Sequence, residues 1–211
     1  MEPRTIELND KIILQINQDL DYGYAGEIWD AALVLAYFLK NKKSEAIINI
    51  KNKIIVELGS GTGFIGLILG ALGAKKIILT DKGDCLKLLK QNYENNISKF
   101  DKKMICEIKE LDWTKEEDKK NIHDKIDYII GSDIIWDPKL RLPLFKTISY
   151  LMDSNDNIET ILSFQIRDKE IMNFFNLFNK EKYIIEKLPE NLYDDDYKAD
   201  DILIVKIRKI T

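Results

Sequence analysis

The sequence predicts one doubly wound α/β domain of 211 residues, in which helices cover both faces of a largely parallel sheet. From residue 54 onwards, short β-rich apolar runs alternate with helical patterns, as in a parallel sheet with crossover helices. A glycine-rich turn follows the first of these runs, and a chain of this length suits a single domain of this class.

Seven apolar runs are predicted to be strands of this sheet. They cover residues 54–58, 76–80, 104–111, 126–130, 158–164, 183–188 and 202–207. Between the last two runs lie only Pro189 and an acidic loop, with no helical pattern. The final pair should therefore form an antiparallel hairpin, which gives a seven-stranded sheet with an antiparallel final strand.

Helices are predicted where apolar residues recur at helical spacing. Such spacing covers residues 29–39, 65–72 and 86–93, and Asp168 is a suitable N-cap for a helix that reaches Phe178. Residues 1–50 precede the first strand and include a loop with two glycines at residues 22–26. We expect this N-terminal helical and loop extension to cover the ligand site.

Composition excludes several classes of function. A net charge of −4 argues against a protein that grips a nucleic acid backbone. The N-terminus has no apolar run of the length that a secretory signal or membrane span requires, so we expect a cytoplasmic protein without a membrane partner. Two cysteines and one histidine are too few for a zinc cluster, and no metal is expected.

The strongest local pattern is the glycine turn after the first predicted strand, Glu57-Leu58-Gly59-Ser60-Gly61-Thr62-Gly63. Glycines suit a backbone that must adopt positive φ or approach a ligand closely, and the helix that follows offers free N–H groups. With Gly66, the spacing also fits the dinucleotide fingerprint, so the glycines alone leave a nicotinamide enzyme open. The acidic Glu57 before them is typical of methyltransferases, in which the loop faces the methionine part of the cofactor.

Polar residues follow the next two strands, where ligands bind in doubly wound folds. Asp81 ends the second strand, and its carboxylate can accept hydrogen bonds from both hydroxyls of a ribose. Asp112 and Trp113 follow the third, where they can meet the edge and the face of an adenine ring. The alternatives are a solvated turn for the aspartates and a core position for the tryptophan.

The fourth strand ends at Ser132-Asp133, and Trp136 follows. A carboxylate at Asp133 would lie beside a transferred group, where it can orient an incoming amine against an aromatic wall. The alternative for Asp133 is an ordinary helix cap before Pro138.

Taken together, five stretches resemble the methyltransferase-21 group of seven-strand protein-lysine methyltransferases: residues 26–32, 57–66, 111–113, 132–136 and 197–209. Within this group the chain is most similar to the enzymes that methylate valosin-containing protein, a hexameric AAA ATPase. The resemblance covers nearly all of the chain after Tyr22, and the order of the motifs is more specific than any one of them.

The resemblance implies a Rossmann-like methyltransferase fold, S-adenosylmethionine as cofactor, and a protein substrate that bears the target lysine, with a monomer favoured. The residues that would bind the cofactor are Trp29, Glu57, Gly59, Ser60, Gly61, Gly63, Asp81, Asp112, Trp113 and Ser132. Asp133 and Trp136 match the D-x-x-Y motif and would be the catalytic residues, although tryptophan replaces the tyrosine. Arg167 partly matches a further motif, which leaves a substrate contact open, but a surface position at a helix start is the favoured interpretation.

The function expected from these residues is methyl transfer from S-adenosylmethionine to a lysine side chain of a protein. Three alternatives stay open at this point. They are methylation of another acceptor such as arginine, histidine or a small molecule, a nucleotide-binding oxidoreductase, and a cofactor-binding protein without catalytic activity.

Overall fold

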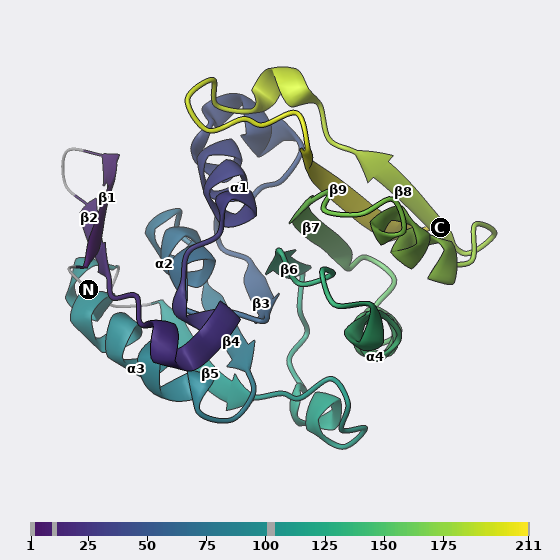
Figure 1. The fold of residues 1–211 in the computed structure, drawn as a ribbon, viewed down its shortest axis with the longest axis horizontal. Helices are drawn as coiled ribbons and strands as arrows, with labels where there is room; N and C mark the ends of the chain where they lie inside the picture. The colour runs from purple at the N-terminus through teal and green to yellow at the C-terminus, as the bar shows by residue number, and fades with distance from the viewer. Residues whose placement is uncertain (1–2, 10–11, 101–103, 211) are drawn as a thin grey trace.

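The computed structural model describes residues 3–9, 12–100 and 104–210. Its centre is a seven-stranded sheet with the order β5-β4-β3-β6-β7-β9-β8 (Figure 1). The strands are β3 (Ile54–Leu58), β4 (Lys76–Asp81), β5 (Ile105–Glu110), β6 (Tyr128–Ser132), β7 (Glu159–Gln165), β8 (Tyr183–Lys187) and β9 (Ile202–Lys209). The pairs among β3 to β7 are parallel, and β9 runs antiparallel to both β7 and β8. The predicted sheet with its antiparallel final strand is confirmed.

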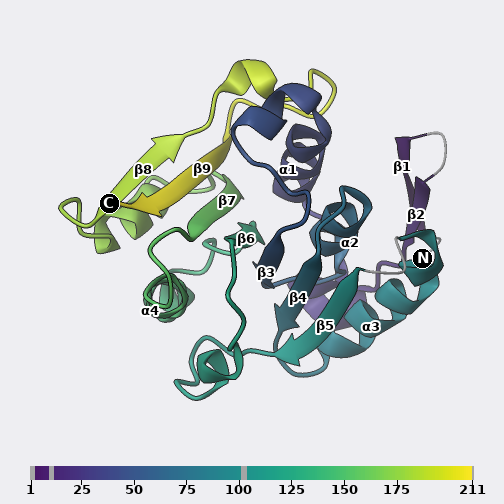
Figure 2. The same cartoon turned by 180° about the vertical axis from the view of Figure 1, so that it is seen from behind.

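Apolar cores lie on both faces of the sheet, because successive side chains of a strand point to opposite sides. Ile55 packs into the core that holds α1 (Asp30–Lys40), α2 (Phe64–Ala71) and Leu89 of α3 (Cys85–Asn96). Its neighbour Val56 packs into the core that holds α4 (Pro138–Met152) and the 3-10 helix η5 (Ile171–Leu177). Figure 2 shows the same arrangement from behind, with α4 on the side of the sheet away from α1 and α2. Helices thus cover both faces, as predicted.

The helix predicted over residues 168–178 is wrong in type and length. The segment forms the 3-10 helix η5, in which the buried Ile171 and Phe174 are three residues apart and so lie above one another. Asp168 accepts a hydrogen bond from the N–H of Glu170 at 2.8 Å and pairs with Arg141 at 3.1 Å, so it begins a turn rather than capping an α-helix.

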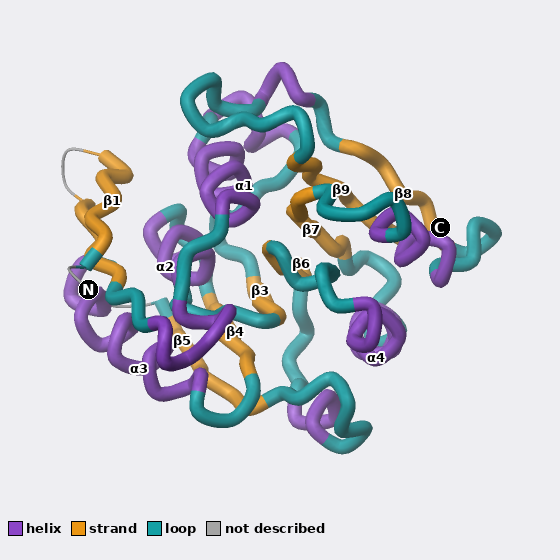
Figure 3. The backbone as a smooth tube through the Cα atoms, viewed as in Figure 1, coloured by secondary structure: helices purple, strands orange, loops and turns teal. Residues whose placement is uncertain are grey.

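Two strands in the N-terminal segment are not among the predicted elements. β1 (Arg4–Asn9) and β2 (Ile12–Ile16) form an antiparallel pair whose buried side chains alternate, as Leu14 and Ile16 show. The 3-10 helix η1 (Leu20–Gly26) connects this pair to α1. Figure 3 shows this connection passing over the ends of β3 and β4. The N-terminal segment thus reaches the edge of the sheet at which ligands bind in this fold class.

Two buried asparagines of α3 attach this N-terminal arm, defined as residues 12–28, to the domain. The amide of Asn92 accepts from the N–H of Asn17 at 2.8 Å and donates to its carbonyl at 2.9 Å. Asn96 does the same with Gln15, at 3.0 and 2.8 Å. Asn92 also donates to the carbonyl of Thr62 at 2.9 Å. One side chain therefore connects the arm to the glycine turn.

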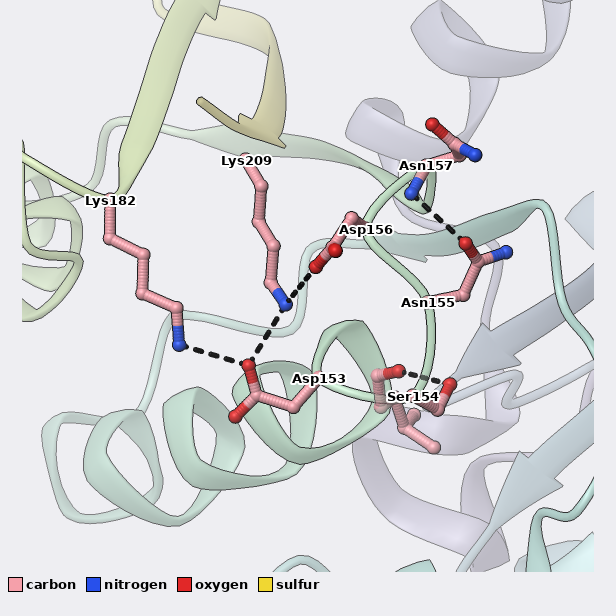
Figure 4. A network of polar contacts seen from close by, with 8 residues as sticks. Asp153, Ser154, Asn155, Asp156, Asn157, Lys182 and Lys209 are labelled. Atoms are coloured by element: carbon pink, nitrogen blue, oxygen red, sulfur yellow. Dashed lines mark hydrogen bonds and ion pairs between the residues drawn. The ribbon is translucent and has the colours of Figure 1, made fainter. Parts of the chain in front are cut away.

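Charged side chains close the opposite edge of the sheet, near the end of β9 (Figure 4). The Nζ of Lys209 lies 3.0 Å from an oxygen of Asp153 and 2.9 Å from one of Asp156, and Lys182 reaches the same oxygen of Asp153 at 2.9 Å. These contacts attach the end of the final strand to the end of α4.

Among the described residues, no helix is long and apolar enough to cross a membrane.

Candidate active site

A cavity of about 590 Å³ lies at the carboxyl ends of β3, β4 and β6 and beneath η1. Its walls include every predicted site residue except Gly63: Trp29, Glu57, Gly59, Ser60, Gly61, Asp81, Asp112, Trp113, Ser132, Asp133 and Trp136. A doubly wound sheet collects its ligand site at this edge, because the loops after parallel strands meet there.

Glycines in the turn after β3 make room for neighbouring groups. Gly59 and Gly61 have φ of 62° and 52°, in a region of backbone angles that residues other than glycine rarely adopt. A Cβ on Gly61 would stand 3.0 Å from the carbonyl oxygen of Ala25, so the glycine lets η1 approach the turn. Gly63 begins α2, and a Cβ there would meet Leu89 at 2.5 Å. Its role in the structure is helix packing rather than lining the cavity.

Glu57 is a buried carboxyl group in the cavity wall. It is 2% exposed, and its Oε2 has no hydrogen-bond partner among the described residues. The oxygen lies over α2, since a Cβ on Gly66 would stand 2.8 Å from it. Burial raises the pKa of Glu57 to about 8, because the charged form loses its hydration. A buried acid with an oxygen left unpartnered suits a ligand that carries a positively charged group.

Asp81 joins the glycine turn to the end of β4. Its Oδ2 accepts from the N–H of Gly61 at 2.7 Å and its Oδ1 from the N–H of Lys82 at 2.8 Å. Burial raises the pKa of Asp81, and the two N–H donors oppose that effect. Each oxygen keeps a second lone pair, so the carboxylate can still accept hydrogen bonds from a ligand hydroxyl.

Asp112 and Trp113 follow β5 and form another part of the wall. Oδ1 of Asp112 accepts from the N–H and the hydroxyl of Thr114, at 2.9 and 2.7 Å. Hydrogen bonding to Thr114 lowers the pKa of Asp112, and its Oδ2 makes no hydrogen bond to a described residue. The ring of Trp113 packs on Gly59, and its Nε1 is buried without a partner in the described part of the chain.

Asp133 forms an ion pair that the sequence analysis did not identify. Arg167 donates from Nη1 and Nη2 to the two oxygens of Asp133, each at 2.5 Å. The side chain of Asp133 is 4% exposed, and its backbone adopts φ of 55°. Arg167 is exposed, as expected, and its side chain also lines the cavity; it lies in the loop between β7 and η5 rather than at a helix start. The helix cap before Pro138 is Asp137, not Asp133.

Comparison with known proteins assigns the chain to a family. A family model described as "Lysine methyltransferase" matches residues 8–181. The chain belongs to this lysine methyltransferase family.

Two curated relatives of this methyltransferase carry different names. Protein N-lysine methyltransferase METTL21A of Xenopus tropicalis is 30% identical over 165 residues, 78% of this chain and 72% of the relative. Methyltransferase-like protein 23 of Dictyostelium discoideum is 31% identical over an alignment of 222 residues, 97% of this chain and 85% of the relative. A solved structure of SMU.776, a putative methyltransferase complexed with SAH, has a TM-score of 0.59 and 15% sequence identity to this chain. The match covers 99% of this chain and 56% of the SMU.776 chain.

The methyltransferase takes S-adenosylmethionine as its cofactor, and the cavity fits this group. The ligand carries an amino acid part with a positive charge, a ribose and an adenine. Two of the buried side-chain atoms that lack a hydrogen-bond partner among the described residues, Oε2 of Glu57 and Nε1 of Trp113, belong to the cavity wall, and Asp81 offers acceptors. Gly59 and Gly61 keep the turn free of side chains. These residues would hold the cofactor, while Ser60 supports the turn by accepting from the N–H of Thr80 at 3.1 Å.

Aromatic rings form the mouth of the methyltransferase cavity. The aromatic mouth consists of Tyr24 from η1, Trp29 before α1 and Trp136 after β6. The Nε1 of Trp29 donates to the carbonyl of Tyr24 at 2.7 Å. The guanidinium of Arg167 lies 5.6 Å from the centre of the Trp29 ring. The half-buried Trp29 thus contacts both η1 and the ion pair.

The acidic run after β8 consists of Asp194, Asp195, Asp196, Asp200 and Asp201, and Asp201 contacts the end of β7 beside Arg167. The carboxylate of Asp201 accepts from the amide of Gln165 at 2.8 Å, and its carbonyl accepts from the N–H of Ile166 at 2.7 Å. Both partners immediately precede Arg167 in the sequence. Asp201 therefore adds negative charge near Arg167, which lines the cavity.

Proposed function

We propose that this methyltransferase transfers methyl groups from S-adenosylmethionine to a lysine side chain of a protein. The observation that carries the proposal is the buried carboxylate of Asp133, which lies between the cofactor turn and an aromatic mouth that opens to solvent. Trp136 is 37% exposed, so a side chain that projects from a protein surface can enter here. The name of the METTL21A relative also supports a lysine acceptor.

The chain's own residues would bind, orient and desolvate the amine. When bound, S-adenosylmethionine supplies an electrophilic methyl group on a sulfonium. A lysine must be neutral to attack, because the protonated amine has no free electron pair. The lysine nitrogen would take this methyl group, S-adenosylhomocysteine would leave, and the new ammonium would lose a proton to water. Oδ1 of Asp133 accepts from Arg167 and from the N–H of Gln165 at 3.4 Å, whereas Oδ2 accepts from Arg167 alone and keeps a lone pair that can accept from the amine.

The resemblance to enzymes that methylate valosin-containing protein makes a hexameric AAA ATPase of that type the first substrate to test. We further propose that the methyltransferase is a cytoplasmic monomer. Asp201 of the methyltransferase, near the aromatic mouth, suits a basic patch around the target lysine of the substrate.

The test is transfer of radiolabelled methyl groups into a purified AAA ATPase and into cell lysate, followed by mass spectrometry of the labelled protein. We expect label on lysine, and its loss with Asp133→Asn. Label on arginine, histidine or a small molecule would replace the lysine proposal. Label on a lysine of another protein would refute only the proposal that an AAA ATPase is the substrate.

A further inference from the structure

Two of the rings in the aromatic mouth form a solvent-exposed wall. The centres of Tyr24 and Trp136 are 4.5 Å apart and the rings are inclined by 53°. Tyr24 is 65% exposed and Trp136 is 37% exposed. The two inclined rings present exposed aromatic surface, and exposed surface of this kind around a cavity indicates a binding partner.

Other contacts hold this wall in place. Trp29 fixes the backbone of Tyr24 through its indole nitrogen, and its ring lies 6.1 Å from the Tyr24 ring. The glycine turn supports the same loop, because Gly61 lets the carbonyl of Ala25 approach. The wall is therefore built from residues that also surround the cofactor.

The carboxylate next to this wall is already neutralised. Both oxygens of Asp133 bind the guanidinium of Arg167, and the pair carries no net charge. An incoming ammonium group would find no unpaired buried carboxylate there. It would instead meet the ring faces of Tyr24 and Trp136.

Methylation of an ammonium group changes which of these surfaces it prefers. A primary ammonium is strongly hydrated and pairs best with a carboxylate. Each methyl group replaces an N–H donor with apolar surface while the charge stays, and aromatic faces bind such cations well. We propose that Tyr24 and Trp136 form a subsite for methylated ammonium groups. Given the proposed function, this subsite retains lysine that already carries methyl groups and favours di- and trimethylated products.

Tetramethylammonium is a direct probe of this subsite in protein loaded with S-adenosylhomocysteine. All three tryptophans of the chain line the cavity, so intrinsic fluorescence reports binding there. Ammonium chloride tests the charge without methyl groups, and tert-butanol tests a similar shape without charge. We expect tetramethylammonium to bind more tightly than tert-butanol by about 3- to 30-fold. Equal affinity for the two would overturn the proposal.

Variants assign the binding to particular rings. Tyr24→Leu and Trp136→Leu should each weaken tetramethylammonium binding by about 3- to 30-fold, whereas Tyr24→Phe keeps the ring and the affinity. Tyr150→Leu is the matched control, because Tyr150 is an aromatic residue of α4 that is 42% exposed and does not line the cavity. Melting temperature and S-adenosylhomocysteine affinity identify any variant that misfolds. An unchanged affinity in a folded Tyr24→Leu variant would refute the assignment.

Lysine methylation itself is measured separately, by mass spectrometry of the labelled protein. Binding of tetramethylammonium without any lysine product would refute the proposed function and leave the subsite intact. Only monomethylated lysine, together with no selective binding of tetramethylammonium, would refute the subsite and leave the proposed function intact.

Discussion

Replacing Glu57 with glutamine should remove a large pH dependence of stability. The pKa of this carboxyl group is about 8 in the folded protein against an ordinary 4.5, because burial disfavours its charged form. This difference corresponds to about 5 kcal/mol at roughly 1.36 kcal/mol per pH unit. The folded state keeps a proton that the unfolded chain loses, so rising pH destabilises the fold between 4.5 and about 8. Below that window the effect is absent, and above it the full loss is present.

Guanidinium denaturation of the wild type and of Glu57→Gln, measured from pH 5 to pH 9, tests this reasoning. The free energy of unfolding of the wild type should fall relative to the variant by up to about 1.4 kcal/mol per pH unit. Subtracting one curve from the other cancels the pH-dependent contributions of titrating groups that both proteins share, including the nearby Asp81 and Cys106. Parallel curves would refute a protonated Glu57 in the protein without ligand.

The same group should link cofactor binding to proton release. A positively charged group favours the ionised form of Glu57, and the amino acid part of S-adenosylhomocysteine carries an ammonium group. If this ammonium lies against Glu57, binding of S-adenosylhomocysteine near pH 7 should release a proton from the wild type. Calorimetry in two buffers with different ionisation enthalpies measures the number of protons released per ligand bound. Glu57→Gln should show no such release, and an equal release from both proteins would assign the proton to another group.

Three other substitutions test the rest of the cavity. Asp81→Ala should weaken S-adenosylhomocysteine binding by about 10- to 100-fold in calorimetry, and wild-type affinity in a folded variant would remove Asp81 from the cofactor site. Asp133→Asn should lower turnover by roughly 30- to 1000-fold with near-normal cofactor affinity, since it alters the amine side of the cavity. Loss of the cofactor instead would place Asp133 in the nucleoside site. Asn92→Leu should release the N-terminal arm, which limited proteolysis would detect, and should lower cofactor affinity. An arm as protected as in the wild type would contradict the role of this amide.

Local patterns were sufficient for the sheet and for most of the cavity wall. The glycine turn begins α2, and Asp81 ends β4 as expected, because strand ends and helix starts depend on neighbouring residues. The predicted strand over residues 104–111 is observed as Ile105–Glu110. Residue types at strand ends therefore located the candidate site before any distance was known.

Contacts between distant segments could not be predicted in the same way. Asp133 and Arg167 are 34 residues apart, and they meet because β6 and β7 pair in parallel, with Ser132 opposite Ser163. No local pattern contains that register. Tyr24 was also missed, because an aromatic residue in a glycine-containing loop has no periodic neighbours that would indicate its partner.

Asn92 and Asn96 bind the N-terminal arm through its main chain, and every residue except proline offers the same groups. The side chains of residues 15 and 17 can therefore change in evolution without loss of these hydrogen bonds, whereas the two amides cannot. The arm also supplies Tyr24 to the rim of the cavity. Residues at the rim can thus be substituted, which would change the target protein, while the main-chain hydrogen bonds keep the arm in place over the cofactor site.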